Sequence, residues 1–204
     1  MVNIDCLLLA GGASKRMGEP KMLLGLGSGT LFEHVLESYL GSSVRHITAV
    51  VPGWLEGFEP VRERYGSNRV DFVALPGECE MSRSLKAGWK HAVERWRPDA
   101  MMIALADKPL VTPGVIDSVI GGYGASGSKI CVPVFGGVWG HPVILSAELE
   151  SDIDGLDGDR GARDIIEAHR DDVTEVAVDT DAILVDVDTL EDFDALRRRL
   201  NQVG

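Results

Sequence analysis

Residues 7–21 read LLLAGGASKRMGEPK, an apolar run that breaks into two glycines and then turns basic. With residues 4–6 added, the run has the length and, apart from Asp5, the hydrophobicity of a buried strand. The glycines would let backbone N–H groups approach an anion closely, and Arg16 and Lys21 add positive charge beside them. In an open α/β sheet, ligands bind beyond the carboxyl ends of the strands. The stretch therefore predicts a first strand that ends in a cradle for a polyphosphate.

The loop matches neither of two common phosphate-binding fingerprints. Glu19 follows Gly18 where G-x-x-x-x-G-K-[ST] requires a lysine, and the pattern G-x-G-x-x-G is absent. An ATPase P-loop and a dinucleotide fingerprint are therefore not supported. On the loop alone, an ordinary strand-to-helix turn with exposed lysines remains the alternative.

Short apolar runs of the same kind recur along the chain and alternate with amphipathic segments. They occupy residues 44–51, 70–75 and 100–106 and read as buried strands. The segments between them carry helix-start signals, which are Thr30 with Glu33, Ser82 or Ser84, and Thr112 with Pro113. This alternation predicts the α/β class, with a mostly parallel, Rossmann-like sheet between two layers of helices.

The rhythm changes after about residue 125. Residues 129–135 and 138–146 read as two strands joined by a Gly-Gly turn, and we expect them to form a small β-ribbon at the edge of the sheet. The remaining pattern predicts a helix at 162–170, short strands at 175–178 and 182–187, and a last helix capped by Thr189. Since the chain shows no internal repeat or linker, we expect residues 1–204 to form a single domain.

The composition is that of an ordinary globular protein, with 45% hydrophobic and 25% charged residues. The formal net charge of −12 argues against nucleic acid as a partner. Cys6, Cys79 and Cys131 are too far apart for a disulfide framework or a zinc pattern. No basic region precedes the first apolar run, and no apolar stretch approaches the ~20 residues of a membrane span. We therefore expect a soluble, cytoplasmic protein with no signal peptide and no membrane partner.

The segment LAGGASKRMGEPK resembles the signature L-A-(A/G)-G-x-S-x-R-M-G-x-x-K of the nucleotidyltransferases that attach a nucleotide to molybdopterin. Later segments resemble that family in the same order, namely EMSRSLKAG, ALADKPLV, GHPVILS, GDRGARDII and VDVDTLEDF. The likeness runs from residue 6 to about 195. It implies that a phosphate oxygen of the acceptor attacks the α-phosphorus of a nucleoside triphosphate and that pyrophosphate leaves. It also implies Mg²⁺ as the cofactor, and a nucleoside triphosphate and a molybdopterin-type acceptor as ligands.

The resemblance carries over to individual residues. The implied nucleotide-binding residues are Leu9, Ala10, Gly11, Gly12, Ser14, Arg16, Lys21, Ser84 and Leu85. Lys21, Arg16 and Asp107 are the implied catalytic residues, and the two cations would neutralise charge on the α-phosphate and on the departing pyrophosphate. The implied acceptor-binding residues are His141, Pro142 and Arg163.

Asp107 and Asp188 are the candidate ligands for Mg²⁺, which prefers carboxylate oxygen and water. Asp107 ends the apolar run 100–106, so its carboxylate would emerge at the ligand edge of the sheet. For each aspartate an alternative stays open. Asp107 could be a turn or cap residue, and Asp188 could belong to an acidic run in which Thr189 starts a helix. No general base is needed, because a phosphate monoester has a second pKa of about 6.

The choice of nucleotide rests on small differences within the family. EPKMLL, GHPVILS and GDRGAR resemble the cytidylyltransferases, whereas the pair Gly11-Gly12 is more typical of the guanylyltransferases. Glu80, Lys108 and Leu190 also depart from the family pattern. We expect transfer of CMP from CTP to the phosphate of molybdopterin. The alternatives are GTP as the donor, a sugar phosphate or other small acceptor, and a non-catalytic molybdopterin chaperone. A recipient molybdoenzyme or its chaperone is a further expected partner.

Overall fold

The structure is a computed structural model that describes residues 2–11, 20–53, 58–77 and 80–201. The strands of its main sheet are β1 (Ile4–Leu9), β4 (Ile47–Pro52), β5 (Val70–Leu75), β6 (Ala100–Leu105), β7 (Ile130–Phe135), β8 (Val138–Trp139), β9 (Val143–Ser146) and β10 (Val173–Ala177). Within the described residues they form one eight-stranded sheet of order β10-β7-β9-β6-β1-β4-β5, and β8 pairs with β7. β2 (Gly25–Leu26) and β3 (Gly29–Thr30) form a separate antiparallel ribbon.

The first strand lies at the centre of a parallel block. β1 pairs in parallel with β4 on one side and with β6 on the other, and β4 pairs in parallel with β5. All six residues of β1 are buried, which its apolar residues predict and which includes the charged Asp5. The residues that follow β1 and β6 therefore leave the sheet at the same edge.

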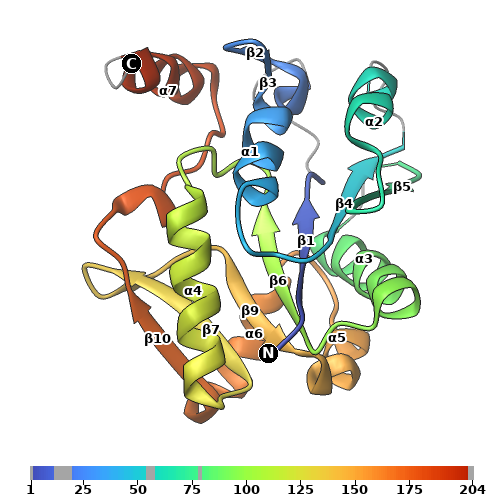
Figure 1. The fold of residues 1–204 in the computed structure, drawn as a ribbon, viewed down its shortest axis with the longest axis vertical. Helices are drawn as coiled ribbons and strands as arrows, with labels where there is room; N and C mark the ends of the chain where they lie inside the picture. The colour runs from blue at the N-terminus through green and yellow to red at the C-terminus, as the bar shows by residue number, and fades with distance from the viewer. Residues whose placement is uncertain (1, 12–19, 54–57, 78–79, 202–204) are drawn as a thin grey trace.

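Helices cover both faces of this sheet, so the predicted three-layer arrangement is confirmed (Figure 1). One face packs against α1 (Leu31–Leu40), α2 (Glu59–Tyr65) and α4 (Pro113–Ser126). The other face packs against α3 (Met81–Trp96), α5 (Glu150–Gly155) and α6 (Ala162–Ala168). Side chains alternate between these two cores, since Cys6 and Leu8 lie in the first and Leu7 and Leu9 in the second.

The last helix, α7 (Leu190–Asn201), lies beyond the sheet, close to the β2–β3 ribbon (Figure 1). Val187, Phe193 and Leu196 pack there against Leu26 and Leu31 in a third apolar cluster. Short 3₁₀ turns complete the described elements: η1 (Lys21–Leu23), η2 (Ala147–Leu149), η3 (Arg170–Asp172) and η4 (Asp181–Ile183). The third cluster holds the C-terminal segment against the N-terminal one.

The expectation of a β-ribbon at the edge formed by residues 129–135 and 138–146 is wrong in its position. β7 and β8 do form a hairpin, but the chain then breaks at Gly140–Pro142 and continues into β9. β9 runs antiparallel between β6 and β7, inside the sheet. All four of its residues are buried, as expected for a strand inside a sheet whose two faces are covered by helices.

Most of the predicted helix starts are confirmed. Thr30 and Glu33 form both hydrogen bonds of a capping box, Thr112 caps α4, and the Thr189 Oγ1 atom accepts a hydrogen bond from the backbone N–H of Asp192 at the start of α7. The expectation that Ser82 or Ser84 caps α3 is wrong. That helix begins at Met81, and both serines are buried within it.

The expected strand at 182–187 is also wrong, because its first residues form η4. Ala182 and Ile183 are buried there, so burial in a turn explains the apolar pattern.

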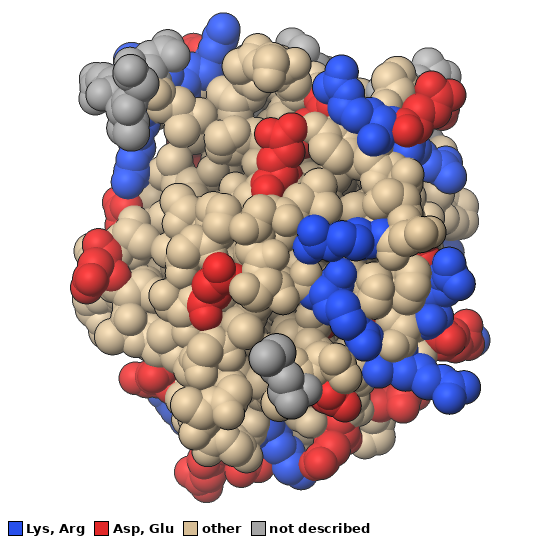
Figure 2. All heavy atoms as spheres, in the orientation of Figure 1, with Lys and Arg blue, Asp and Glu red and all other residues tan. Residues whose placement is uncertain are grey.

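Acidic and basic side chains are distributed differently over the surface. In Figure 2 acidic side chains are scattered over the face shown, and basic ones gather on the side where α2 and α3 lie. Among the described residues, no helix is both long and apolar enough to cross a membrane.

Candidate active site

Three segments that are far apart in the sequence meet at the carboxyl edge of the parallel block. Leu9 pairs with Leu105 where β1 and β6 end, and Gly11 and Asp107 follow these two strands. The segment before α7 joins them through a hydrogen bond of 3.0 Å from the Val187 N–H to the Asp107 carbonyl. The edge of the sheet is therefore closed by the last quarter of the chain.

Lys21 lies at the centre of this junction. Its Nζ donates hydrogen bonds to Asp107 Oδ2 at 2.9 Å, to Asp188 Oδ1 at 3.1 Å and to the Val187 carbonyl at 3.0 Å. The Lys21 side chain is 9% exposed, so the ammonium is held in one place and shielded from water. The structure thus brings together Lys21, Asp107 and Asp188, all three of which sequence reasoning had selected.

The two carboxylates fit the binding of a divalent cation. Asp107 Oδ1 is buried and has no hydrogen-bond partner among the described residues, so it is available as a ligand. The described chain contains no group of three or more His, Cys, Asp or Glu residues that could hold a metal. Mg²⁺ is usually bound by one or two carboxylates, with water and substrate phosphates as the other ligands. Asp107 and Asp188 meet that requirement.

A cavity of about 50 Å³ opens beside Lys21. Its walls are Leu9, Ala10, Gly11, Lys21, Met22, Met81, Ser84, Leu105 and Asp107. A Cβ atom on Gly11 would lie 3.1 Å from Ser84 Oγ, so the backbone after β1 passes closely over the first turn of α3. Among the expected nucleotide-binding residues, Leu9, Ala10, Gly11, Lys21 and Ser84 line this cavity.

The other four expected nucleotide-binding residues are not among the described residues that line the cavity. The side chain of Leu85 is fully buried in the core between α3 and the sheet, so only its backbone is available to a ligand. Gly12, Ser14 and Arg16 lie outside the described residues. The contribution expected from the basic loop therefore stays a prediction.

His141 lies just before β9, which pairs with β6 on the side away from β1. Its backbone N–H donates to the Ile183 carbonyl at 3.1 Å, and its peptide bond to Pro142 is cis. Its Nδ1 is buried without a hydrogen-bond partner among the described residues. Burial, and then the positive charge of Lys108, lower the pKa of His141 to about 4, so the ring is neutral at pH 7.

Lys108 is the residue of this region that sequence reasoning did not select as a functional residue. It is buried directly after Asp107 and is close enough to act on the ionisation of His141. The sequence did offer one sign of this: Lys108 departs from the family pattern at the position directly after the motif aspartate, Asp107.

Arg163, expected on the acceptor side, lies at the start of α6. Its Nε donates to Glu167 Oε1 at 3.0 Å, and its side chain is 75% exposed. The turn before α6 is tied to α3, because the Met81 N–H donates to Asp159 Oδ1 at 3.1 Å and the Ser82 N–H donates to the Gly158 carbonyl at 3.1 Å. This turn is therefore held next to Met81 in the cavity wall, while the role of Arg163 itself stays a prediction.

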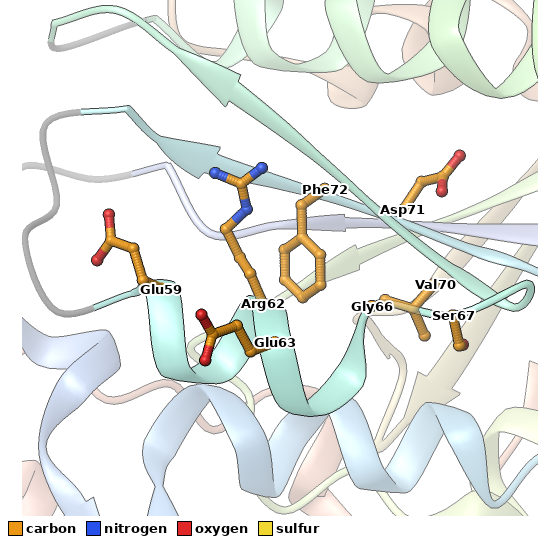
Figure 3. Close-up of a pocket in the computed structure, with 8 residues that line it drawn as sticks. All are labelled: Glu59, Arg62, Glu63, Gly66, Ser67, Val70, Asp71 and Phe72. Carbon is orange, nitrogen blue, oxygen red and sulfur yellow. The ribbon is translucent and has the colours of Figure 1, made fainter.

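A larger hollow of about 550 Å³ lies between α2 and β5 (Figure 3). Arg62 and Phe72 line it from the helix and from the strand. None of the buried unpaired polar atoms of the described residues belongs to its walls, and Asp71 already accepts a hydrogen bond from His91. The cavity near Lys21 is smaller, but its wall includes Asp107, whose Oδ1 atom is buried without a hydrogen-bond partner among the described residues.

In open α/β sheets ligands bind beyond the carboxyl ends of the strands, and the buried Lys21 lies there with Asp107 and Asp188. The chain belongs to the family of the MobA-like NTP transferase domain, whose sequence model matches residues 6–173. It is thus a nucleotidyltransferase, and the resemblance inferred from the motifs is confirmed.

The relatives of this chain cover it almost completely. It is 25% identical over 205 residues to the purine catabolism protein PucB of Bacillus subtilis, across 96% of each chain. It is 24% identical over 204 residues to the molybdenum cofactor cytidylyltransferase of Escherichia coli, across 100% of each chain.

Solved structures share the fold. The Rv0371c homologue from Mycobacterium sp. strain JC1 has a TM-score of 0.83 and 27% identity, with 99% of this chain and 98% of that chain covered. Rv0371c of Mycobacterium tuberculosis in complex with manganese has a TM-score of 0.76 and 24% identity, with 97% and 98% covered.

Proposed function

We propose that the protein transfers CMP from CTP to the phosphate of a molybdopterin-type acceptor and releases pyrophosphate. The observation that carries the proposal is the buried Lys21 ammonium held between Asp107 and Asp188 beside the cavity lined by Gly11 and Ser84. Similarity to the E. coli cytidylyltransferase over the full chain supports this choice of nucleotide and acceptor. We also propose that the product is handed to a recipient molybdoenzyme or to its chaperone.

The reaction joins two polyanions, so positioning and charge neutralisation are its main requirements. An oxygen of the acceptor phosphate forms a bond to the α-phosphorus of CTP, and the bond from that phosphorus to the oxygen bridging the α- and β-phosphates breaks. The electron pair leaves with pyrophosphate. The acceptor is already an anion at neutral pH, so no side chain has to remove a proton. Lys21 is fixed before the substrate arrives, which lets its charge act without reorganisation.

Asp107 and Asp188 are the residues that would hold a divalent cation, and we assign Mg²⁺ to them. When bound, the cation would neutralise phosphate charge and orient the triphosphate. The buried, unpaired Asp107 Oδ1 supports this assignment from the side of the protein. The solved complex of Rv0371c with manganese is in keeping with a divalent cation in a protein of this fold.

The choice of base is tested by pyrophosphate release from each of the four nucleoside triphosphates with purified molybdopterin. We expect the highest kcat/KM for CTP and measurable activity with GTP, because Gly11-Gly12 leaves more room than an alanine would. A strong preference for GTP contradicts the choice of CTP. No release with any nucleotide contradicts the proposed function as a whole, and a sugar phosphate serves as the control acceptor.

Gly11→Ala is the variant that sharpens this test. Its methyl group would lie 3.1 Å from Ser84 Oγ, so it narrows the space between the loop and α3. We expect the CTP to GTP ratio of kcat/KM to rise by about tenfold, in line with the effect of one methyl group in a snug pocket. An unchanged ratio shows that the base is read elsewhere.

A further inference from the structure

Lys108 is a buried cation with little to neutralise it among the described residues. Its side chain is 7% exposed, and its Nζ lies 3.9 Å from Asp186 Oδ2, which is beyond hydrogen-bond distance. In the described part of the chain, no other carboxylate lies within ion-pair distance of this ammonium, and no atom accepts a hydrogen bond from it. Asp186 is itself 57% exposed, so water screens much of its charge.

Lys21 shows how this fold satisfies a buried lysine. Its ammonium donates to three oxygens between 2.9 and 3.1 Å away. Burying an ammonium without such partners is strongly unfavourable. Lys108 is thus a position at which an anion from outside the chain would be bound favourably.

His141 lies on the same side of the site. Val143 pairs with Ile103 in the antiparallel ladder of β9 and β6, so His141 lies level with the end of β6, where Asp107 and Lys108 follow. Its buried Nδ1 makes no well-formed hydrogen bond among the described residues, although the ring lies near the backbone of Ile103. Because the ring is neutral at pH 7, the positive charge at this point comes from Lys108, and His141 adds an uncharged polar atom.

The two lysines are spaced along one segment. Lys21 contacts the Val187 carbonyl and Asp188, and Lys108 lies nearest to Asp186. Two phosphorylated substrates repel each other, so a cation beside each of them would favour their approach.

We propose that Lys108 binds the phosphate group of the acceptor, with the His141 ring as a second polar contact, while Lys21 serves the nucleotide. The proposal rests on the proposed function and deepens it, because it names the residue that binds the acceptor phosphate. A phosphate monoester carries a charge of about −1.5 to −2 at pH 7 and offers three acceptor oxygens. Such a group meets the need of a buried ammonium, whereas a neutral alcohol does not. The acceptor must accordingly come from a reaction that leaves a phosphate monoester.

Inorganic phosphate is the probe that tests Lys108 directly. We would titrate it into the free protein and into protein saturated with Mg²⁺ and α,β-methylene-CTP, and follow binding by ³¹P NMR. Lys108→Met keeps most of the apolar stem and removes the charge, and we expect it to weaken phosphate binding by about tenfold or more. Equal affinity in the wild type and in Lys108→Met overturns the proposal, and so does a wild type that does not bind phosphate.

Asp186→Asn is the matched control. If Lys108 served only its ion pair, removal of Asp186 would weaken phosphate binding as much as removal of Lys108. We expect instead that Asp186→Asn binds phosphate at least as tightly as the wild type, because a competing carboxylate is gone. We also expect Lys108→Met to melt at no lower temperature than the wild type. A lower melting temperature, or equal losses of binding in both variants, points to a structural lysine and overturns the proposal.

Turnover separates this proposal from the proposed function. With CTP and molybdopterin, Lys108→Met should raise the KM for the acceptor about tenfold and leave the KM for CTP within about twofold. A rise in the KM for CTP alone would assign Lys108 to the nucleotide and overturn the proposal. If the wild type released no pyrophosphate, the proposed function would fail, while the phosphate titrations would still report on Lys108 because they need no turnover.

Discussion

At the amino end of the sheet Asp5 is 1% exposed and surrounded by partners, whereas at the carboxyl end Asp107 keeps one buried oxygen unpaired among the described residues. Arg45 donates to Asp5 from Nε at 2.9 Å and from Nη2 at 3.0 Å. The Nδ1 atom of His46 lies 3.3 Å from the same carboxylate, and the His46 ring stacks on Trp96 at 4.0 Å. The two aspartates thus lie at opposite ends of neighbouring strands, and they differ in how many of their carboxylate oxygens have hydrogen-bond partners.

The difference separates a structural role from a functional one. Both carboxylate oxygens of Asp5 accept hydrogen bonds from Arg45. Arg45 also donates to the carbonyl of Trp96, so Asp5 and Arg45 together join β1, the start of β4 and the end of α3.

At the other end, Asp107 Oδ1 and His141 Nδ1 are buried without partners in the described chain. Thr48 Oγ1, Trp89 Nε1 and Trp96 Nε1 are also buried without partners in that part of the chain, and none of them carries a charge. An unpaired carboxylate oxygen is the costlier group to bury, so we interpret Asp107 Oδ1 as the atom that a ligand would satisfy.

The largest expected effect comes from Asp107→Asn. The amide keeps the shape of the side chain but removes the charge that a divalent cation requires, and we expect kcat/KM to fall by about 10²–10³. Asp188→Asn should weaken metal binding less, because Asp188 is the more exposed of the two carboxylates. A metal titration of activity measures both effects. Overlap of the titration curves of Asp107→Asn and the wild type would place the metal elsewhere.

Lys21→Ala should lower turnover by about 10², through loss of one preorganised charge. The variant should fold, but its free energy of unfolding should fall, because Asp107 and Asp188 are then left facing each other without the ammonium. Circular dichroism and urea unfolding check the fold, and pyrophosphate release at saturating Mg²⁺ checks the rate. Turnover at the wild-type rate would remove Lys21 from the mechanism.

Asp5→Asn makes the same chemical change at the opposite end of the sheet. Breaking a buried ion pair leaves its partners uncompensated, so we expect the free energy of unfolding to fall by about 3 kcal/mol. Urea unfolding measures this loss. Since Asp5 lies away from the site, kcat/KM should stay within about twofold of the wild type. A loss of activity without a loss of stability would contradict the assignment of a structural role to Asp5.

The smallest expected effect is a dependence of stability on pH that comes from His141. Its pKa is about 4 in the folded protein, below the usual value near 6.5, so the unfolded chain takes up a proton first as the pH falls. The contribution of His141 to the free energy of unfolding is complete only well above pH 6.5 and is lost as the pH falls toward 4, with a loss of about 1 kcal/mol between pH 7.5 and 5.5. His141→Gln should lack this component when unfolding is measured at both pH values. Equal pH dependence in the two proteins would contradict the shifted pKa.

Local patterns predicted the parallel block well. The mainly apolar runs predicted β1 and β5, and Thr30 and Thr112 predicted the starts of their helices, because these signals depend on neighbours in sequence. The meeting of Gly11 and Asp107 followed from the rule that parallel strands end at the same edge.

The misses have a common physical cause. Apolar runs do not specify which strands pair, so the insertion of β9 between β6 and β7 was not visible in the sequence. The burial of Lys108 and the unpaired Nδ1 of His141 depend on that same insertion and on the segment before α7. The roles of the individual site residues, the single domain and the cytoplasmic location stay predictions.

The hydrogen bonds that join Val187 to Asp107 and to Lys21 have a consequence for biosynthesis. Lys21 and Asp188 are 167 positions apart, so the site closes one of the longest loops that the chain can form. Such long-range contacts form late, because closing a large loop costs entropy before any contact repays it. A nascent chain on the ribosome could thus assemble the parallel block well before it has a complete site. An incomplete polypeptide would then have the folded sheet but lack the segment with Val187 and Asp188 that completes the candidate site.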